Sequence, residues 1–120
     1  MSNNIFKLKE LEKLVGYRFS DPNVLKQALT HASLERSSWN VYERLEFLGD
    51  RVLGLVVSET LLKRFPNERE GQISRRYANL VKRDSLAVVA RKIKFGEYLL
   101  ISAGEEAAGA RESVTILSDA

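Results

Sequence analysis

Apolar residues recur at three- and four-residue spacing along most of this chain, which is the pattern of helices with one buried face. The first predicted helix has such a stripe and should end at Gly16. Its apolar positions are Leu8, Leu11, Leu14 and Val15. Asp21-Pro22 predicts the start of a second helix, because aspartate caps helix N-termini and proline suits the first helical position. The stretch 32–41 is rich in Ser and Asn and is predicted to be a loop.

The longest periodic segment runs from about Tyr42 to Phe65, where Pro66-Asn67 should end it. A further helix is predicted over about 72–82, and Asp84 is expected to cap the next one, which should break at Gly96. Residues 97–112 are expected to be irregular, and 113–120 read as the first turns of another helix. Little of the chain reads as strand, and it shows no internal repeat or linker. The pattern therefore predicts a single all-α domain, a helical bundle.

The long predicted helix carries three acidic residues near its start. At about 100° per residue, Glu43, Glu46 and Asp50 fall within roughly 60° of one another. The other side is expected to face the core, which would make this a central and mostly buried helix with its carboxylates at the mouth of a cleft. That apolar side consists of Leu45, Leu48, Val52 and Leu55.

Carboxylates held this close repel one another and need either a cation or a shifted pKa. Oxygen donors with no nearby His or Cys favour magnesium or manganese over zinc. The helical spacing leaves a second interpretation open, in which the three acids form an ordinary solvated face.

Length and composition add limits. A chain of 120 residues with 44% hydrophobic and 29% charged residues matches one globular domain. The absence of cysteine excludes disulfides and thiolate metal sites. No apolar run approaches the roughly 20 residues needed to cross a bilayer, and the N-terminus lacks the features of a secretory signal. We therefore expect a cytoplasmic protein without a membrane partner.

The net charge of +3 is unevenly distributed. Basic residues gather at 75–76, 82–83 and 91–94, whereas acids gather at 43–50. A positive surface around a negative pocket suits an enzyme that attracts a polyanion and holds a cation where it acts. An ordinary solvated surface would give the same charge pattern.

One string inside the long helix is much more specific than its charge pattern. Residues 42–53, Y-E-R-L-E-F-L-G-D-R-V-L, closely resemble the signature of the ribonuclease III family. Further segments resemble that family's motifs in the same order. They are Q-A-L-T-H-A-S at 27–33, R-F-P at 64–66 with E-G at 70–71, and R-E-S at 111–113 with I-L-S-D at 116–119. The resemblance covers essentially the whole chain and implies the helical endonuclease-domain fold of that family.

The resemblance implies a magnesium-dependent endoribonuclease that cuts double-stranded RNA, leaving 5′-phosphate and 3′-hydroxyl ends on precursors of ribosomal, messenger and transfer RNA. It implies that Glu46 and Asp119 are metal ligands, with Mn²⁺ as a possible substitute for Mg²⁺. Asp50 would be the residue closest to the chemistry. Glu43 and Glu70 would be supporting catalytic acids near the scissile phosphate.

The family acts as a homodimer, and the resemblance implies that Phe47 contacts the partner subunit. The alternative is that Phe47 packs under a local loop. The sole histidine, His31, is expected to cap or pack, and Trp39 is expected to cover the core rather than touch RNA. Four basic side chains are candidates for contacts to the RNA backbone, with a solvated basic face as the alternative. They are Arg75, Arg76, Lys82 and Arg83.

Two departures from the family pattern affect these expectations. Arg51 stands where many members carry Ser or Ala. The family's further glutamate, three residues after the position of Asp119, would fall beyond Ala120, as would its terminal helices and its double-stranded RNA-binding domain. We therefore expect an endonuclease domain over 1–120 that is incomplete at its C-terminus and weak or inactive as it stands. Two rival functions stay open: a non-catalytic relative that binds RNA or a ribonucleoprotein, and a purely structural helical domain.

Overall fold

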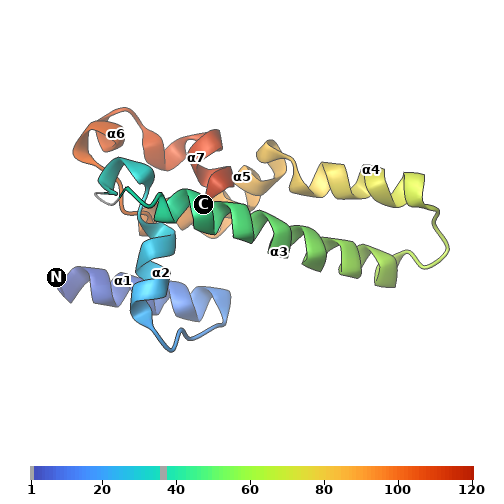
Figure 1. Cartoon of the computed structure of the whole chain (residues 1–120), viewed down its shortest axis with the longest axis horizontal. Coiled ribbons are helices and arrows are strands. Elements are labelled where there is room, and N and C mark those ends of the chain that lie inside the picture. The colour runs from blue at the N-terminus through green and yellow to red at the C-terminus, as the bar shows by residue number, and fades with distance from the viewer. Residues whose placement is uncertain (1, 36–37) are drawn as a thin grey trace.

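A computed structural model describes residues 2–35 and 38–120, and these residues fold almost entirely into helices (Figure 1). The α-helices are α1 (Ser2–Val15), α2 (Pro22–Leu29), α3 (Val41–Arg64), α4 (Glu70–Val81), α5 (Arg83–Lys92), α6 (Ala103–Ala107) and α7 (Val114–Asp119). Short 3-10 helices lie between them: η1 (Ala32–Leu34), η2 (Phe95–Tyr98) and η3 (Ala110–Glu112). Within the described residues the only β contact is an isolated parallel bridge between Thr30 and Leu100. The prediction of an all-α domain is confirmed.

The hydrophobic core lies in the half of the molecule that holds both chain ends. It is built by α1, α2, α5, the segment after η2, and α7. Its buried members are Leu11, Leu25, Leu29, Ala87, Ala90, Leu99 and Leu117. Each fully buried leucine contributes roughly 1.5–3 kcal/mol relative to exposure, and the two alanines of α5 let neighbouring helices approach closely. The bridge adds two backbone hydrogen bonds, from the His31 N–H to the Leu100 oxygen at 2.8 Å and from the Leu100 N–H to the Leu29 oxygen at 2.9 Å.

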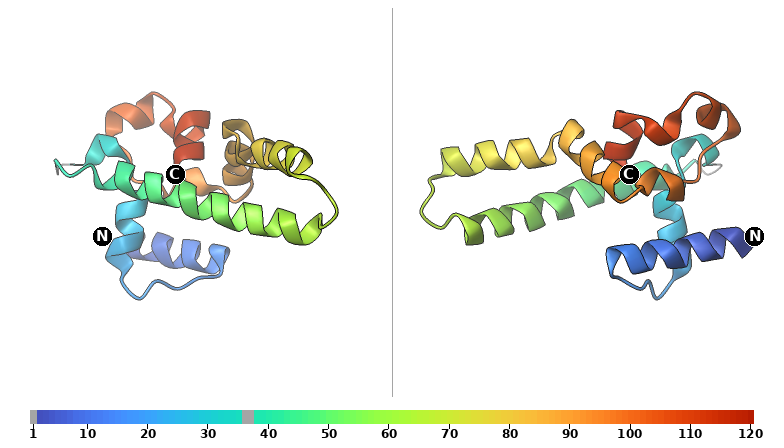
Figure 2. Two further views of the ribbon diagram at one scale, coloured as in Figure 1. Left: turned by 45° about the vertical axis from the view of Figure 1, so that its right-hand side comes forward. Right: turned by 180° about the vertical axis from the view of Figure 1, so that it is seen from behind.

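Helices α3 and α4 form an antiparallel hairpin that projects away from this core (Figures 1 and 2). The molecule measures 51 × 31 × 29 Å, and its radius of gyration of 16.0 Å exceeds the about 14 Å typical of a compact chain of this length. Gly54 lets the helices approach, because a Cβ atom there would lie 2.7 Å from the Tyr77 hydroxyl oxygen. At the turn, Arg76 pairs with both carboxylate oxygens of Glu68 and stacks over the Phe65 ring.

The first turn of α3 is capped in a way that the sequence pattern did not indicate. Asn40 precedes the helix in a left-handed conformation, with φ of 51°, and its side chain makes no capping hydrogen bond. The Glu35 carboxylate accepts hydrogen bonds from the backbone N–H groups of Val41 and Tyr42 instead. A carboxylate at this position also complements the positive end of the helix dipole.

The helix boundaries expected from the sequence agree with the structure within one or two residues for α2, α3 and α4. Other expectations are wrong. Asp84 was expected to cap a helix but lies in the first turn of α5, for which Lys82 is the N-cap. The segment 97–112 contains α6 and η3 rather than being wholly irregular, and η1 lies inside the predicted loop. Residues 36 and 37 of that loop lie outside the described residues.

The prediction that α3 is central and mostly buried is also wrong. Only Tyr42 and Leu61 are buried along this helix within the described structure. In the stripe that was expected to face the core, Leu48, Val52 and Leu55 are exposed. The physical reason is that α3 leaves the core after its first turns and has one neighbour, α4, over its remaining length (Figure 1). Among the described helices, none is both long enough and apolar enough to span a membrane.

Candidate active site

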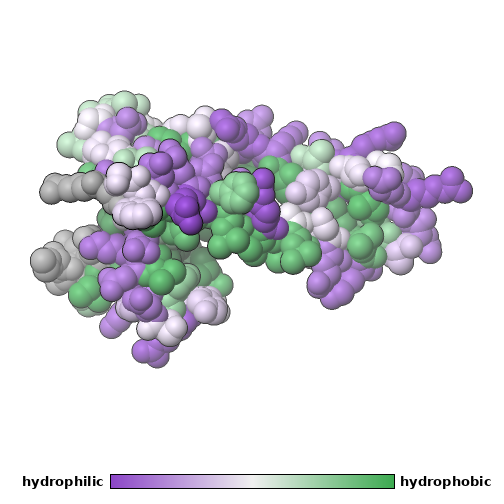
Figure 3. All heavy atoms as spheres, viewed as in Figure 1, coloured by the Kyte–Doolittle hydropathy of each residue, from purple (hydrophilic) through white to green (hydrophobic). Residues whose placement is uncertain are grey.

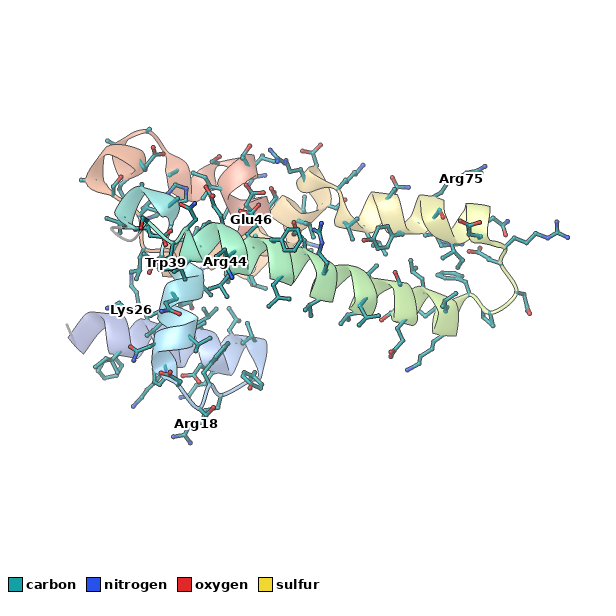
Figure 4. All side chains as sticks on the ribbon, viewed as in Figure 1. Arg18, Lys26, Trp39, Arg44, Glu46 and Arg75 are labelled. Carbon is teal, nitrogen blue, oxygen red and sulfur yellow. The ribbon has the colours of Figure 1, made fainter. Side chains whose placement is uncertain are left out.

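The end of α7 returns to the first part of α3 and brings acidic residues from distant parts of the sequence together (Figures 1 and 2). Glu46 lies on α3 beneath the end of α7 (Figure 4). Partial burial raises the pKa of the Glu46 carboxyl, and the negative charges of Asp119, Asp50 and Glu43 raise it further, whereas Arg83 lowers it. We call Glu43, Glu46, Asp50 and Asp119 the acidic site. The negative charges of the other three members favour the protonated form of Glu46, and they would favour a bound cation for the same reason.

The position of Asp119 depends on how α7 is anchored. The Ser113 hydroxyl caps the helix by accepting a hydrogen bond from the Ile116 N–H at 3.4 Å, and Leu117 is buried in the core against α5. Arg83, at the start of α5, donates to the Thr115 hydroxyl at 3.3 Å. Its guanidinium also lies 4.0 Å from a carboxylate oxygen of Asp119. These contacts hold the last turn of α7 over α3.

Tyr42 is a member of this neighbourhood that the sequence interpretation did not single out. Its side chain is only 6% exposed, and within the described residues its hydroxyl group has no hydrogen-bond partner. Burial, together with the nearby charges of Glu46 and Asp119, raises the pKa of the Tyr42 hydroxyl to about 12. Helical spacing was the available signal, because Tyr42 precedes Glu46 by one turn and therefore shares its face.

The structure brings some of the expected acids together and separates another. Glu43 and Asp50 are exposed on the same helix as Glu46, whereas Glu46 and Asp119 are partly buried. Glu70 begins α4 at the far end of the hairpin, and the rise of a helix puts that end about 27 Å from Glu46. Within one chain, Glu70 therefore lies outside the acidic site.

The donor chemistry of the acidic site fits a hard divalent cation, because all four members offer carboxylate oxygens. The buried Tyr42 hydroxyl group has no hydrogen-bond partner within the described residues, and a carboxylate that binds such an ion would be a suitable acceptor for it. In the part of the chain that the structure describes, however, no three acidic or histidine side chains stand close enough together to hold one ion. The arrangement offers a pair of converging carboxylates with two further acids nearby.

Phe47 is exposed beside the acidic site. Its side chain is 62% exposed, and the Arg51 guanidinium lies over the ring, 4.0 Å from its centre. The alternative that Phe47 packs under a local loop does not agree with this exposure. Phe47 belongs to a set of five apolar side chains of α3 that are each more than half exposed and together span about half of the helix circumference, which we call the α3 apolar face. Its members are Phe47, Leu48, Val52, Leu55 and Val56. Figure 3 shows apolar surface where α3 crosses the middle of the molecule.

The four basic candidates do not form one uniform surface. Arg75 is exposed and points outward from α4 (Figure 4), and Lys82 is exposed at the junction of α4 and α5. Arg76 is engaged with Glu68 and Phe65 at the hairpin turn, and the hydrogen-bonded Arg76 guanidinium lowers the pKa of the Glu68 carboxyl. Arg83 reaches the acidic site. Within the described residues, Arg75 and Lys82 are therefore the two of these four that form no ion pair.

The predictions for His31 and Trp39 have different outcomes. His31 does cap, as expected: its Nδ1 atom accepts a hydrogen bond from the Ser33 N–H at 3.1 Å at the start of η1. Its ring also packs edge-on against Tyr42. The expectation that Trp39 covers the core is wrong, because the side chain is 76% exposed next to the start of α3.

Comparison with known proteins assigns the fold and the family. Residues 21–120 match the model of the family described as ribonuclease-III-like. The chain belongs to that family. Its curated relatives include ribonuclease 3 of Oleidesulfovibrio alaskensis, which is 49% identical over 115 residues, and ribonuclease 3 of Histophilus somni, which is 45% identical over 113 residues. The alignments cover 93% and 94% of this chain but 50% and 49% of those proteins. The chain thus spans about half the length of the curated relatives it matches.

Solved structures of the ribonuclease III family agree with this membership. The nuclease domain of ribonuclease III from Campylobacter jejuni superposes with a TM-score of 0.83 at 46% identity, covering 97% of this chain and 76% of that one. A second structure of that domain, described for flexibility in a region involved in dimer formation, gives a TM-score of 0.83 at 45% identity over 94% of this chain. The helical arrangement described above is therefore the fold of a ribonuclease III nuclease domain.

Proposed function

We propose that this chain provides the endonuclease domain of an enzyme that hydrolyses phosphodiester bonds in double-stranded RNA, including precursors of ribosomal, messenger and transfer RNA. The observation that carries the proposal is the approach of Asp119 on α7 to Glu46 on α3, two helices far apart in the sequence; burial raises the pKa of the Glu46 carboxyl, and the charge of Asp119 raises it further. A protein that only bound RNA would have no use for carboxylates gathered toward a polyanion. Membership of the ribonuclease-III-like family supports the same activity. A cytoplasmic location stays a prediction from the sequence.

Glu46 and Asp119 are the proposed ligands of Mg²⁺, for which Mn²⁺ could substitute. When bound, such an ion lowers the pKa of water and offsets negative charge on the reacting phosphate. Asp50 is proposed to orient the attacking water, because it shares the Glu46 face of α3 and is open to solvent. Glu43 is proposed to assist on the same face. Arg83 would limit the repulsion among these carboxylates while the ion is absent, because its positive charge lowers the pKa of Glu46.

We also propose that the active form is a homodimer formed through the α3 apolar face. Exposed apolar side chains on this scale mark interaction surfaces, and here they cover about half of the circumference of a projecting helix. The dimer would give Glu70 a role that it lacks within one chain, because a residue at the tip of the hairpin can reach only a site on another copy. In that arrangement Glu70 would act as a supporting acid near the RNA of the partner. Arg75 and Lys82 would contact the phosphate backbone, which they reach from exposed positions.

Cleavage of a labelled RNA duplex in the presence of Mg²⁺ tests the catalytic assignment. The chain extended along its gene to the length of its relatives is compared with the 120-residue chain, for which we expect weak or no cutting. In the extended chain, Asp50→Asn should abolish cutting but leave duplex binding intact. Glu59→Gln is the matched control, since it removes an exposed carboxylate of α3 outside the acidic site and should cut normally. Cutting by Asp50→Asn at a near-normal rate would refute the assignment.

Metal uptake separates the nuclease from a purely structural domain. Titration of the extended chain with Mg²⁺ and then Mn²⁺, followed by calorimetry, should give saturable heat that disappears in Glu46→Gln. A structural domain predicts no saturable heat with either ion. A non-catalytic RNA-binding relative would bind the duplex without cutting it in the extended form.

Light scattering across a concentration series tests the dimer. Phe47→Ala should weaken self-association, because Phe47 is the largest side chain of the α3 apolar face. Phe6→Ala is the control, as it removes a phenylalanine on α1 that is even more exposed, at 74% against 62%. A wild-type chain that stays monomeric at every concentration, or equal weakening by both substitutions, would contradict the proposed interface.

A further inference from the structure

We propose that Tyr42 is a positioning residue of the acidic site, whose hydroxyl donates a hydrogen bond to the Glu46–Asp119 pair and holds these carboxylates for a divalent cation. This role rests on the proposed function, because it is directed at the same ion. Tyr42 would not touch the RNA or the reacting phosphate. It would act through the two carboxylates by fixing where their oxygens lie.

The first observation is a buried hydroxyl that has nothing to bond to. The Tyr42 side chain is 6% exposed, and in the described part of the chain its oxygen lacks a hydrogen-bond partner. Burying a hydroxyl without a partner costs roughly 1–3 kcal/mol, and most buried polar groups in native proteins avoid that cost. A hydroxyl group in this state beside two carboxylates can donate a hydrogen bond to them when a cation draws them together.

The second observation is that everything else about Tyr42 is held in place. Its backbone N–H donates to the Glu35 carboxylate at 3.4 Å. Its ring packs edge-on against His31, with 5.7 Å between ring centres. The hydroxyl therefore sits at the end of a fixed side chain, which is the property that a residue needs in order to orient another group.

The third observation is the identity of the neighbours. Glu46 lies one helical turn beyond Tyr42, and its side chain leans back toward the start of α3. Asp119 approaches from α7, and the charges of both carboxylates raise the pKa of the Tyr42 hydroxyl. A phenol keeps its proton at neutral pH, and an ionised carboxylate only accepts hydrogen bonds, so a hydrogen bond between them runs from Tyr42 to the carboxylate. The Arg83 guanidinium lies 4.0 Å from an Asp119 carboxylate oxygen, and its side chain is more exposed than that of Asp119.

The experiment compares Tyr42→Phe with the wild type, both in the extended chain. Calorimetric titration with Mg²⁺ and with Mn²⁺ measures affinity, and urea unfolding in EDTA measures the stability of the metal-free protein. Tyr98→Phe is the matched control, because it removes a phenolic oxygen that lies 3.5 Å from Glu10, on the α1 side of the molecule. We expect Tyr42→Phe to weaken metal affinity by about 10–100-fold, the usual effect of losing a partner that orients a ligand. Metal-free stability should be unchanged or higher, because the lost hydroxyl had no bond there. Tyr98→Phe should leave affinity unchanged.

Three results would overturn the proposal. Equal metal affinity in Tyr42→Phe and the wild type would mean that the hydroxyl does not orient the ligands. A parallel loss of metal-free stability and affinity would show that Tyr42 serves the fold alone. Failure of the wild-type chain to take up either ion would overturn this role together with the proposed function, whereas uptake by the wild type with unchanged affinity in Tyr42→Phe would overturn this role only.

Discussion

The Tyr77 hydroxyl group of α4 lies close against Gly54 of α3, and an added methyl group at Gly54 tests how tightly this contact is packed. Alanine inside a helix is favoured over glycine by about 0.5–1 kcal/mol. At this position, however, the new Cβ would lie 2.7 Å from the Tyr77 hydroxyl oxygen, which is closer than real Cβ contacts come. Either the tyrosine or the whole of α4 must shift, and overpacking of this kind costs about 1–3 kcal/mol. We therefore expect Gly54→Ala to lower the free energy of unfolding by about 1 kcal/mol.

Removing the Tyr77 hydroxyl group tests whether the clash explains the loss of stability. The next nearest atom to the added Cβ is Tyr77 Cζ at 3.7 Å, an ordinary contact distance. In a Tyr77→Phe background the clash should vanish, and Gly54→Ala should then stabilise by about 0.5–1 kcal/mol. The sign of the effect thus reverses, which corresponds to a coupling of about 2 kcal/mol between the two positions.

Urea unfolding of the four proteins in this cycle measures the coupling. Gly49→Ala is the control, because it lies on the same helix with nothing within 4 Å of the added Cβ, and it should stabilise by about 0.5–1 kcal/mol. Repeating the melts at two protein concentrations separates these effects from any change in association. The reasoning fails if Gly54→Ala stabilises as much as Gly49→Ala, or if the two substitutions of the cycle are simply additive.

Three further predictions concern the site and the elements that hold it. Because the folded-state pKa of Glu46 is raised, its protonated form is favoured, so metal-free stability falls as pH rises from about 4.5 through that pKa. Glu46→Gln should therefore be more stable than wild type at pH 7 by at most about 1 kcal/mol, with no difference near pH 4 in urea melts, and saturating Mg²⁺ should reverse the order. Glu35→Ala should lower the free energy of unfolding by about 1 kcal/mol in the same melts, since it removes the cap of α3, and the stability of Glu35→Gln should lie between those of Glu35→Ala and the wild type. Arg111→Met should cost about 2 kcal/mol in thermal melts, because its guanidinium donates to the backbone oxygens of Gly96 and Leu99, each at 2.8 Å; no loss would mean that water replaces it.

Local signals in the sequence were sufficient for most of the helices. Asp21-Pro22 predicts the start of α2, and the Asp21 carboxylate does accept a hydrogen bond from the Asn23 N–H. The same rule failed at Asp84, because α5 begins two residues earlier, with Lys82 as its N-cap and no side-chain capping hydrogen bond. The rule also did not predict the cap of α3, because Glu35 lies six residues before Val41 and not at the N-cap position.

Periodicity predicts which residues share a face of a helix but not what covers that face. The spacing of Glu43, Glu46 and Asp50 placed them together correctly, yet the apolar positions around Leu55 were assigned to the core and are exposed in the structure. A helix wheel cannot distinguish a face buried within one chain from a face open for a second one. The pairing of Glu46 with Asp119 was available only through family resemblance, because no local rule links two residues so far apart in sequence.

The projecting hairpin makes α3 a lever. Its first turn is clamped in the body of the molecule, and the length beyond Glu46 is about 27 Å. A tilt of about 5° at the clamped end would therefore sweep the turn between α3 and α4 through about 2 Å, a displacement as large as the tolerance of a catalytic contact. Substitutions around Tyr42 and His31 can thus displace Glu70 without any change in the residues between them.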